Sequence, residues 1–279
     1  MIDRRAFLAA AAGVVAAVPR LAHAQLSRTT LKGTFKQGEL IVGQTAPNGI
    51  VTLDGKALLV SAEGRFAFGF PYDRKTVAHL DVRFPDGAHE SQDLSPVVRQ
   101  YDIQRISGLP ESYVSPPADI LERIKRETAL FRQARERDIR ETWFAAGFDW
   151  PVPGIISSVY GSQRILNGEP RAPHLGVDIA APTGTPIHAP AEAIVSVSGD
   201  YYLDGGFTIL DHGHGVSTNY GHQSKMLVAV GDHVVRGQII GEVGQTGRAT
   251  GPNVHWGMNW FQVALDPSLS TRTPAPAKS

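Results

Sequence analysis

Two segments that lie about eighty residues apart constrain the fold most, because each alternates bulky apolar side chains with polar or small ones. In residues 174–180, His, Gly, Asp and Ala alternate with Leu, Val and Ile. In residues 253–260, Asn, His, Gly and Asn alternate with Val, Trp, Met and Trp. A period of two puts every second side chain on one face of a β-strand, so both segments are predicted to be half-buried strands.

The polar faces of these two strands carry side chains that bind metals. His174 and Asp178 would project from the same face with only Gly176 between them, and His255 would project from the second strand. Two imidazoles and one carboxylate are the ligand set of a catalytic zinc site, in which a fourth position is left for water. A lone His-x-x-x-Asp in a glycine-rich domain also occurs without any metal, so this hypothesis needs support from the surrounding sequence.

Further motifs surround these residues and follow one another in a fixed order. They occupy residues 159–161, 174–186, 189–191, 211–215, 220–222, 230–232, 237–238, 244–247 and 251–256. The ordered series resembles that of the lysostaphin-type (LytM-like) zinc metallopeptidases, which cleave peptide cross-bridges in bacterial cell walls. The resemblance covers about residues 150 to 268. It implies an antiparallel β peptidase domain that hydrolyses peptide bonds of peptidoglycan with Zn²⁺.

The resemblance also implies roles for single residues. His174, Asp178 and His255 would bind the zinc, and His222, in the Tyr-Gly-His motif, would be a catalytic imidazole. One position departs from the family pattern, because Asn253 stands where the first histidine of His-x-His is usual. Asparagine can donate a hydrogen bond but cannot exchange a proton near neutral pH, so Asn253 is expected to weaken catalysis.

The composition limits the chemistry that is available. The chain has no cysteine, which excludes disulfides, thiolate metal sites and a thiol nucleophile. Its 27 basic and 27 acidic residues give a formal net charge of zero, which argues against nucleic acid as a partner. With 279 residues, of which 42% are hydrophobic, the chain can form one to two domains with a sizeable core.

The first 24 residues have the features of an export signal. Arg4 and Arg5 precede an apolar run, and Ala22 and Ala24 provide a small-x-small cleavage site. The paired arginines favour a twin-arginine signal, although an ordinary secretory signal also has positive charge here. The run is shorter than a membrane span requires, so the mature protein is expected to lack one and to reside in the periplasm or cell envelope.

Residues 25–105 are predicted to form a small β-sandwich. Short alternating runs are separated by Asn48-Gly49, Asp54-Gly55, Glu63-Gly64 and Asp86-Gly87, which suit tight hairpin turns. No catalytic constellation is visible there. His79 and His89 are interpreted as ordinary strand or surface residues, and a role in docking or in shading the active site is the alternative.

The remaining chain is expected to be helical first and then mainly β. Residues 106–148 form a predicted helical linker, since residues 118 to 146 contain neither proline nor glycine and Glu122 and Arg126 can pair at i,i+4. Residues 149–269 form the predicted zinc metallopeptidase-like domain, and residues 270–279 a disordered tail. His188, His212, His214 and His233 are interpreted as structural.

Three function classes are compatible with this sequence. The first is a zinc-dependent peptidoglycan endopeptidase that acts outside the cytoplasm. The second, which Asn253 favours, is a wall-binding or regulatory protein of the same fold that activates other cell-wall hydrolases. The third is a lipoyl- or biotinyl-type carrier module, suggested by the hairpin-like residues 230–238, but it leaves the His and Asp set unexplained.

Overall fold

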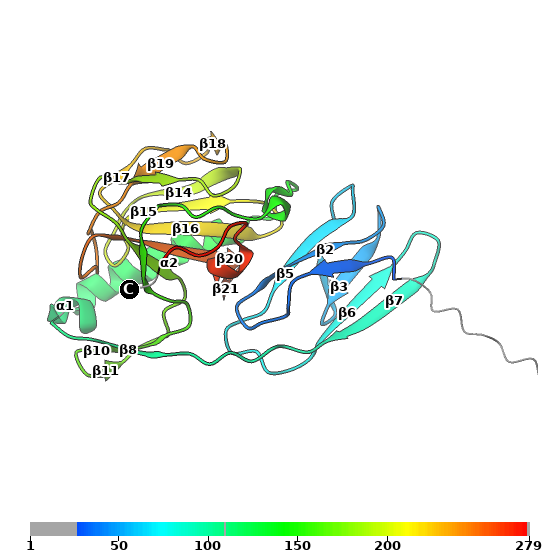
Figure 1. Ribbon diagram of the computed structural model, residues 1–279, viewed down its shortest axis with the longest axis horizontal. Coiled ribbons are helices and arrows are strands. Elements are labelled where there is room, and N and C mark those ends of the chain that lie inside the picture. Colours follow the sequence, from blue (N-terminus) through cyan, green and yellow to red (C-terminus); the bar gives the residue numbers. More distant parts are fainter. Residues whose placement is uncertain (1–26, 109, 278–279) are drawn as a thin grey trace, which may run out of the picture.

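The computed structural model describes residues 27–108 and 110–277. The predicted signal peptide, residues 1–24, lies outside the described residues. Two β assemblies stand side by side, and a linker runs along both of them (Figure 1). In the described part of the chain, no helix combines the length and the apolar character that a membrane crossing requires.

The smaller assembly is the predicted sandwich. Its strands are β1 (Thr30–Lys32), β2 (Leu40–Gln44), β3 (Ile50–Leu53), β4 (Lys56–Leu58), β5 (Arg65–Gly69), β6 (Ala78–Arg83) and β7 (His89–Leu94). They form two antiparallel sheets, in the orders β1-β2-β5 and β4-β3-β6-β7. Ile41, Phe68 and Leu80 belong to the core that these sheets share. Asn48 and Asp54 take positive φ angles of 60° and 50° in the predicted turns.

The larger assembly is built on one antiparallel sheet. Its strands are β9 (Ile155–Ser158), β12 (Val177–Ala180), β14 (Ala193–Tyr201), β15 (Gly205–Asp211), β16 (Val216–Gln223), β18 (His233–Val234), β20 (Asn253–Trp260) and β21 (Val263–Leu265). Their order is β18-β14-β15-β16-β20-β12-β9, and β21 pairs with β20. Val177, Tyr220, Val254 and Trp256 are buried in its core. The expectation of a mainly β chain with an antiparallel C-terminal domain is confirmed.

Two small sheets complete the larger assembly. One contains β13 (Pro186–His188), β19 (Ile239–Glu242) and β17 (Lys225–Met226), in that order. The other contains β11 (Glu169–Pro170), β10 (Gln163–Leu166) and β8 (Ile103–Ile106). Strand β8 lies at the end of the segment predicted to be the sandwich, residues 25–105, and pairs in parallel with β10, so that Gln104 lies opposite Arg164. The end of this segment therefore contributes a strand to the larger assembly.

The helical linker is shorter than the sequence indicates. Its helices are α1 (Glu111–Val114) and α2 (Ala118–Arg135), and two 3₁₀ turns follow later, η1 (Trp143–Ala146) and η2 (Pro267–Ser270). The predicted helix was expected to continue to about residue 147. It ends at Arg135 because the next residues bind the turn between β15 and β16: Arg137 pairs with Asp211 at 2.9 Å, and the Ile139 carbonyl accepts from His214 N–H.

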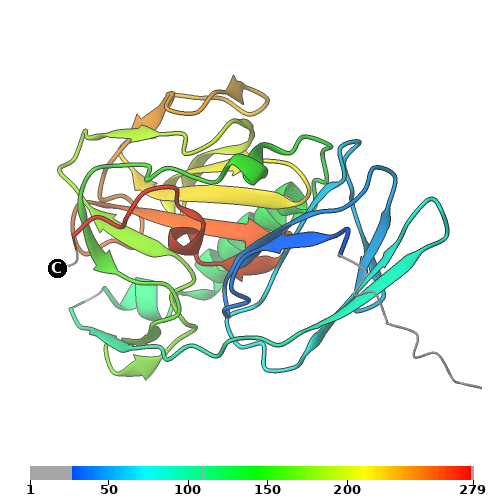
Figure 2. The same ribbon diagram turned by 45° about the vertical axis from the view of Figure 1, so that its right-hand side comes forward.

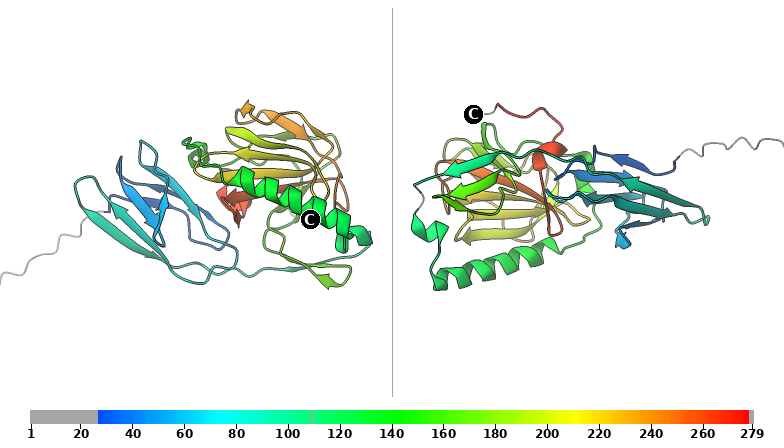
Figure 3. Two further views of the ribbon diagram at one scale, coloured as in Figure 1. Left: turned by 180° about the vertical axis from the view of Figure 1, so that it is seen from behind. Right: turned by 90° about the horizontal axis from the view of Figure 1, so that it is seen from below.

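Helix α2 covers one side of the large sheet (Figure 3). Phe131 packs its ring against Tyr201 and Phe207, with centroids 4.8 and 4.7 Å apart. Phe131 is the only residue of the helix that is buried. Phe131 is therefore the aromatic anchor that holds α2 on the sheet.

The two assemblies are in direct contact (Figure 2). A side chain at Gly69 of the sandwich would collide with Leu265 of β21. The Asp266 N–H donates to the Gly38 carbonyl at 2.7 Å, and Arg99 pairs with the buried Asp266 carboxylate at 2.8 Å. The C-terminal end of the large sheet therefore rests on the sandwich.

The segment from Ser270, which was expected to be a disordered tail, makes ordered contacts up to Ala277. Arg272 pairs with Asp149 at 2.7 Å, and the Ala277 carbonyl accepts from Ile156 N–H at 2.9 Å. These contacts lay the segment beside β9.

Candidate metal centre

The register between β12 and β20 sets the geometry of the site. Asp178 lies opposite His255, and Val177 lies opposite Trp256. Residues that face each other in an antiparallel ladder project to the same side of the sheet. Val177 and Trp256 enter the core, so Asp178 and His255 share the other face.

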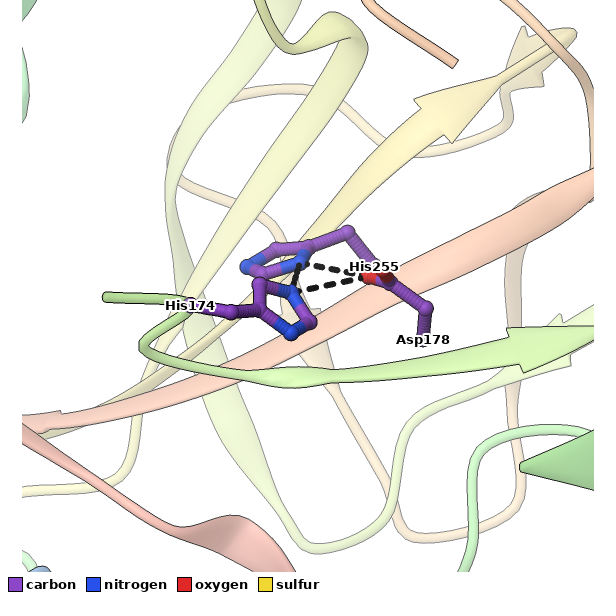
Figure 4. Close-up of side chains that lie close together, drawn as sticks. All are labelled: His174, Asp178 and His255. Carbon is purple, nitrogen blue, oxygen red and sulfur yellow. Dashed lines mark hydrogen bonds and ion pairs between the residues drawn. The ribbon is translucent and has the colours of Figure 1, made fainter. Parts of the chain in front are cut away.

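His174 reaches the same face from a loop. The first segment was predicted to be extended from residue 174, but strand β12 begins only at Val177. The backbone of His174 is held instead by the preceding loop, because its N–H donates to the Ser162 carbonyl and its carbonyl accepts from Gly161 N–H. The side chains of His174, Asp178 and His255 then converge (Figure 4).

Three atoms of these side chains form a nearly equilateral triangle. His174 Nε2 lies 3.0 Å from Asp178 Oδ1 and 3.0 Å from His255 Nδ1, and the last two atoms are 2.9 Å apart. Three ligands of a tetrahedral zinc, each at roughly 2.0 to 2.2 Å, lie roughly 3.3 Å from one another. Among the described residues this is the one group of three that could hold a metal ion.

A hydrogen-bonded chain sets the tautomer of His174. Ser158 Oγ donates to Gln104 Oε1 at 3.0 Å and lies 2.9 Å from His174 Nδ1. Since the serine proton is directed to Gln104, His174 Nδ1 carries a hydrogen and donates it to Ser158 Oγ. The lone pair of His174 is therefore on Nε2, the atom in the triangle, which is the arrangement that a metal ligand needs.

The surroundings of the triangle keep His174 and Asp178 deprotonated. Burial lowers the pKa of His174 to about 4, although the charge of Asp178 opposes the shift. Burial would raise the pKa of Asp178, but the attraction and hydrogen bonds of His174 and His255 outweigh it and hold this pKa well below its ordinary value. Imidazole and carboxylate bind a metal in these forms, so the donor set fits Zn²⁺.

Arg164 holds the second oxygen of the candidate ligand carboxylate. Its Nη2 donates to Asp178 Oδ2 at 3.0 Å, which leaves Oδ1 for the triangle. Burial lowers the pKa of Arg164, and Asp178 opposes that shift. The sequence reasoning missed Arg164, Ser158 and Gln104. Arg164 and Ser158 lie close to the motif at 159–161, but Gln104 is seventy residues before His174 and has no local signal.

Gly176 is required because the chain passes very close to the imidazole of His255. A Cβ atom at this position would lie 2.4 Å from His255 Cε1 and 2.6 Å from His255 Nε2. Any side chain would push the imidazole out of the triangle. The small residue between His174 and Asp178 therefore makes room for the third ligand.

His222 reaches the site through an unusual backbone conformation. Regular alternation would place it with Tyr220 on the core face of β16. Its φ of 64° turns the chain instead, and its side chain lines the same cavity as Asp178. The ring lies 6.4 Å from that of His255, and Nδ1 donates to the Thr246 carbonyl at 2.8 Å. Burial lowers the pKa of His222 to about 4, so the ring is neutral with its lone pair on Nε2.

Asn253 lies at the edge of the same cavity. Its Nδ2 donates to the Gly251 carbonyl at 2.8 Å, whereas its Oδ1 is buried without a hydrogen-bond partner. The cavity holds about 130 Å³, and Ser157, Arg248 and Thr250 also line it.

The other histidines of the larger assembly have contacts elsewhere. His212 is fully buried, with its ring nitrogens 2.8 Å from the Glu192 carbonyl and from Thr218 Oγ1. His214 packs against Phe144, and His233 pairs with Glu192. His188 lies in β13. None of them belongs to the triangle.

A family comparison agrees with this geometry. Residues 172–267 match the model of peptidase family M23. A Pseudomonas aeruginosa crystal structure described as a peptidase M23 is 30% identical, with a TM-score of 0.65, and the match covers 85% of this chain and 95% of that one. The chain belongs to peptidase family M23. The predicted kinship with lysostaphin-type peptidases is thus confirmed.

Two curated relatives match a little over a third of this chain. The peptidoglycan DD-endopeptidase ShyA of Vibrio cholerae is 40% identical over 102 residues, which are 36% of this chain and 24% of ShyA. The DD-carboxypeptidase/endopeptidase Mpg of Neisseria meningitidis is 42% identical over 103 residues, or 37% of this chain and 24% of Mpg. Each match thus spans about a quarter of the relative.

Proposed function

We propose that this M23 protein is a zinc-dependent endopeptidase that hydrolyses peptide bonds of peptidoglycan. The observation that carries the proposal is the triangle of His174 Nε2, Asp178 Oδ1 and His255 Nδ1 beside a neutral His222. The names of ShyA and Mpg support peptidoglycan as the substrate. Zn²⁺ would supply a Lewis acid that acidifies water and polarises the scissile carbonyl.

The residues of the chain have separate tasks in this reaction. His174, Asp178 and His255 hold the metal, while Ser158 and Arg164 orient two of these ligands. His222 accepts a proton from the attacking water at Nε2 and passes it to the leaving amine. The bond from His222 Nδ1 to the Thr246 carbonyl keeps Nε2 free for this transfer.

Asn253 reduces the efficiency of the reaction in this proposal. Its amide can form hydrogen bonds, but an amide cannot donate or accept a proton in the transition state. One positioned acid or base contributes about 10²- to 10⁴-fold in rate. The enzyme is therefore a slow one.

A second function is supported by the same residue. A wall-binding or regulatory protein that activates other cell-wall hydrolases needs the fold but not a second imidazole, and Asn253 favours it. The two candidates differ in whether purified protein releases peptide fragments from cell walls by itself.

The test combines metal analysis with digestion of purified walls. Wild type should contain about one zinc and release fragments slowly, and Asn253→His should release them about 10² times faster if proton transfer is all that is missing. If wild type and Asn253→His both bind zinc and walls but release nothing, the endopeptidase proposal is wrong and the regulatory one takes its place.

We also propose that the protein works in the periplasm or cell envelope after removal of residues 1–24. The proposed division is a β-sandwich at 25–105, a helical linker at 106–148, the peptidase domain at 149–269 and a tail at 270–279. The export-like sequence and the wall-directed relatives support the location.

A further inference from the structure

Two guanidinium groups line the cavity beside the candidate metal centre. Arg164 and Arg248 are both lining residues, together with Asp178 and Asn253. Arg164 touches Asp178 directly, at 3.0 Å. Burial lowers the pKa of Arg248, and the charges of Arg164 and Arg171 act in the same direction. Two cations in one small, partly enclosed space repel each other unless an anion separates them.

The chain supplies little negative charge to balance this pair. Among the described residues, no ion pair involves Arg248, and the one of Arg164 uses Asp178, whose other oxygen belongs to the triangle. Asp204 attracts Arg248 but forms no ion pair with it, and burial raises the pKa of Asp204. The Nε atom of Arg164 is buried without a hydrogen-bond partner. A bound metal would add two further positive charges next to them.

A purely structural role explains only part of this arrangement. Arg171 Nη2 donates to the Val114 carbonyl at 2.9 Å, which is the expected use of a cation at the C-terminal end of a helix. Arg248 makes a similar but longer contact, 3.4 Å, with the Tyr113 carbonyl. Arg171 does not line the cavity, whereas Arg248 does. The contacts of α1 therefore account for Arg171 and leave the exposure of Arg248 to the cavity unexplained.

We propose that Arg164 and Arg248 form a carboxylate-binding subsite next to the metal centre. The inference rests on the proposed function and specifies its substrate: a wall peptide with a free carboxylate on a residue that flanks the scissile amide. Arg164 places the subsite directly beside the metal centre, because it bonds to the candidate ligand Asp178. The carboxylate must therefore lie close to the scissile amide. Guanidinium groups bind carboxylates through charge-assisted, often bidentate hydrogen bonds. A carboxamide in the same place would leave the two half-buried cations unbalanced.

The test compares cross-linked peptide dimers released from purified walls with the same dimers after carbodiimide conversion of their carboxylates into carboxamides. Binding to the full chain is measured by isothermal titration calorimetry, before and after removal of metal with a chelator. Wild type should bind the acid form about 10 to 100 times more tightly than the amide form in both states, as charge-assisted hydrogen bonds predict. Equal binding of the two forms overturns the subsite.

Variants separate this role from a structural one. Arg248→Gln should reduce the acid-to-amide ratio to about 3 or less, and Arg248→Lys should retain part of it. Arg171→Gln is the matched control: it removes a cation that holds α1 but does not line the cavity, so the ratio should persist. A ratio that falls equally in Arg171→Gln and Arg248→Gln would mean that α1 is responsible, and would also overturn the subsite.

Cleavage of the same dimers distinguishes failure of the subsite from failure of the proposed function. Preferential binding of the acid form without any cleavage contradicts the endopeptidase proposal alone. Cleavage of both forms at equal rates, with equal binding, contradicts the subsite alone. If Arg248→Gln does not fold, the Arg248→Lys and Arg171→Gln variants still decide between the outcomes.

Discussion

The sandwich and the large sheet both contain close His–Asp pairs, yet only one of them builds a candidate metal centre. In the sandwich, His79 Nδ1 lies 2.6 Å from Asp93 Oδ1, and both side chains are more than 60% exposed. In the large sheet, His174 Nε2 lies 3.0 Å from Asp178 Oδ1, with side chains that are 2% and 16% exposed. The shorter contact is thus the one that water surrounds.

The difference shows that a short contact does not by itself make a site. An exposed pair is screened by solvent and contributes little. In the large sheet a second imidazole shares the same carboxylate oxygen, and the serine and arginine behind the ligands fix their orientation. Burial and convergence on one point therefore distinguish a ligand set from a surface ion pair.

The largest effect is expected on zinc content, when the carboxylate of the buried His–Asp pair is removed and the exposed pair serves as the control. Asp178→Ala should lower the zinc content from about one per chain to near zero, because two imidazoles do not complete the site. Asp93→Ala is the matched control, since it also removes the carboxylate of a His–Asp pair, and it should leave the zinc content unchanged. Metal analysis after dialysis measures both; zinc retained in Asp178→Ala would refute the ligand assignment.

The next effect concerns the imidazole that lies near the triangle without belonging to it. His222→Ala should reduce the release of wall peptides by about 10² to 10⁴ while zinc remains bound, since only proton transfer is removed. His233→Ala removes an exposed imidazole that pairs with Glu192 and should leave the rate unchanged. Loss of zinc in His222→Ala would show that this residue is a ligand instead.

A smaller effect should follow from loosening the orientation of a ligand. Ser158→Ala removes the acceptor of the His174 Nδ1 proton and should weaken zinc binding by about 10- to 100-fold. A competition titration with a metal-binding dye measures this change. Ser157→Ala, next in the chain, is the control because its hydroxyl donates to the Asp178 carbonyl and does not touch His174. Equal affinities in the two variants would contradict the role of Ser158.

The smallest effect is expected on stability and comes from His212, a buried histidine that does not belong to the triangle. Burial lowers the pKa of His212 to about 4 in the folded protein, so the unfolded chain binds one more proton between this value and 6.5. Stability from this residue is complete above pH 6.5 and is lost as the pH falls towards 4. Between pH 7.5 and 5.5 the free energy of unfolding should fall by about 1 kcal/mol more in wild type than in His212→Asn.

Denaturant titrations of both proteins at the two pH values, with a chelator present, measure that difference. His174 and His222 titrate in both proteins and cancel in the comparison. The same pH dependence in wild type and in His212→Asn would show that His212 is already accessible to protons in the native state.

Local patterns predicted strands better than they predicted the site. Residues 253–260 form a strand over their whole length, as their alternating pattern predicts, and this strand pairs with β12 on one side and β16 on the other. His174 was expected in a strand but lies in a loop, since its backbone bonds go to residues 161 and 162. The helix-favouring composition continues past Arg135, so a longer helix was expected. Composition alone cannot reveal that Arg137 pairs with the distant Asp211.

The support of the site depends on contacts that no local pattern encodes. Alternation assigns His222 to the core face, and only a positive φ at that residue turns it to the cavity. Gln104 reaches Ser158 because β8 pairs with β10, a parallel pairing between distant segments. Such pairings are decided by tertiary packing, so the convergence of His174, Asp178 and His255 was foreseeable from the sequence, whereas their hydrogen-bond partners were not.

Strand β8 has a consequence for how this protein can be divided. Composition suggests a cut at residue 149, where the linker ends and the glycine-rich region begins. A fragment cut there would lose Ile103–Ile106, leave one edge of β10 unpaired and remove the acceptor of the Ser158 proton. The larger assembly thus extends beyond its apparent boundary at residue 149, and a transplant of it into another protein must include strand β8.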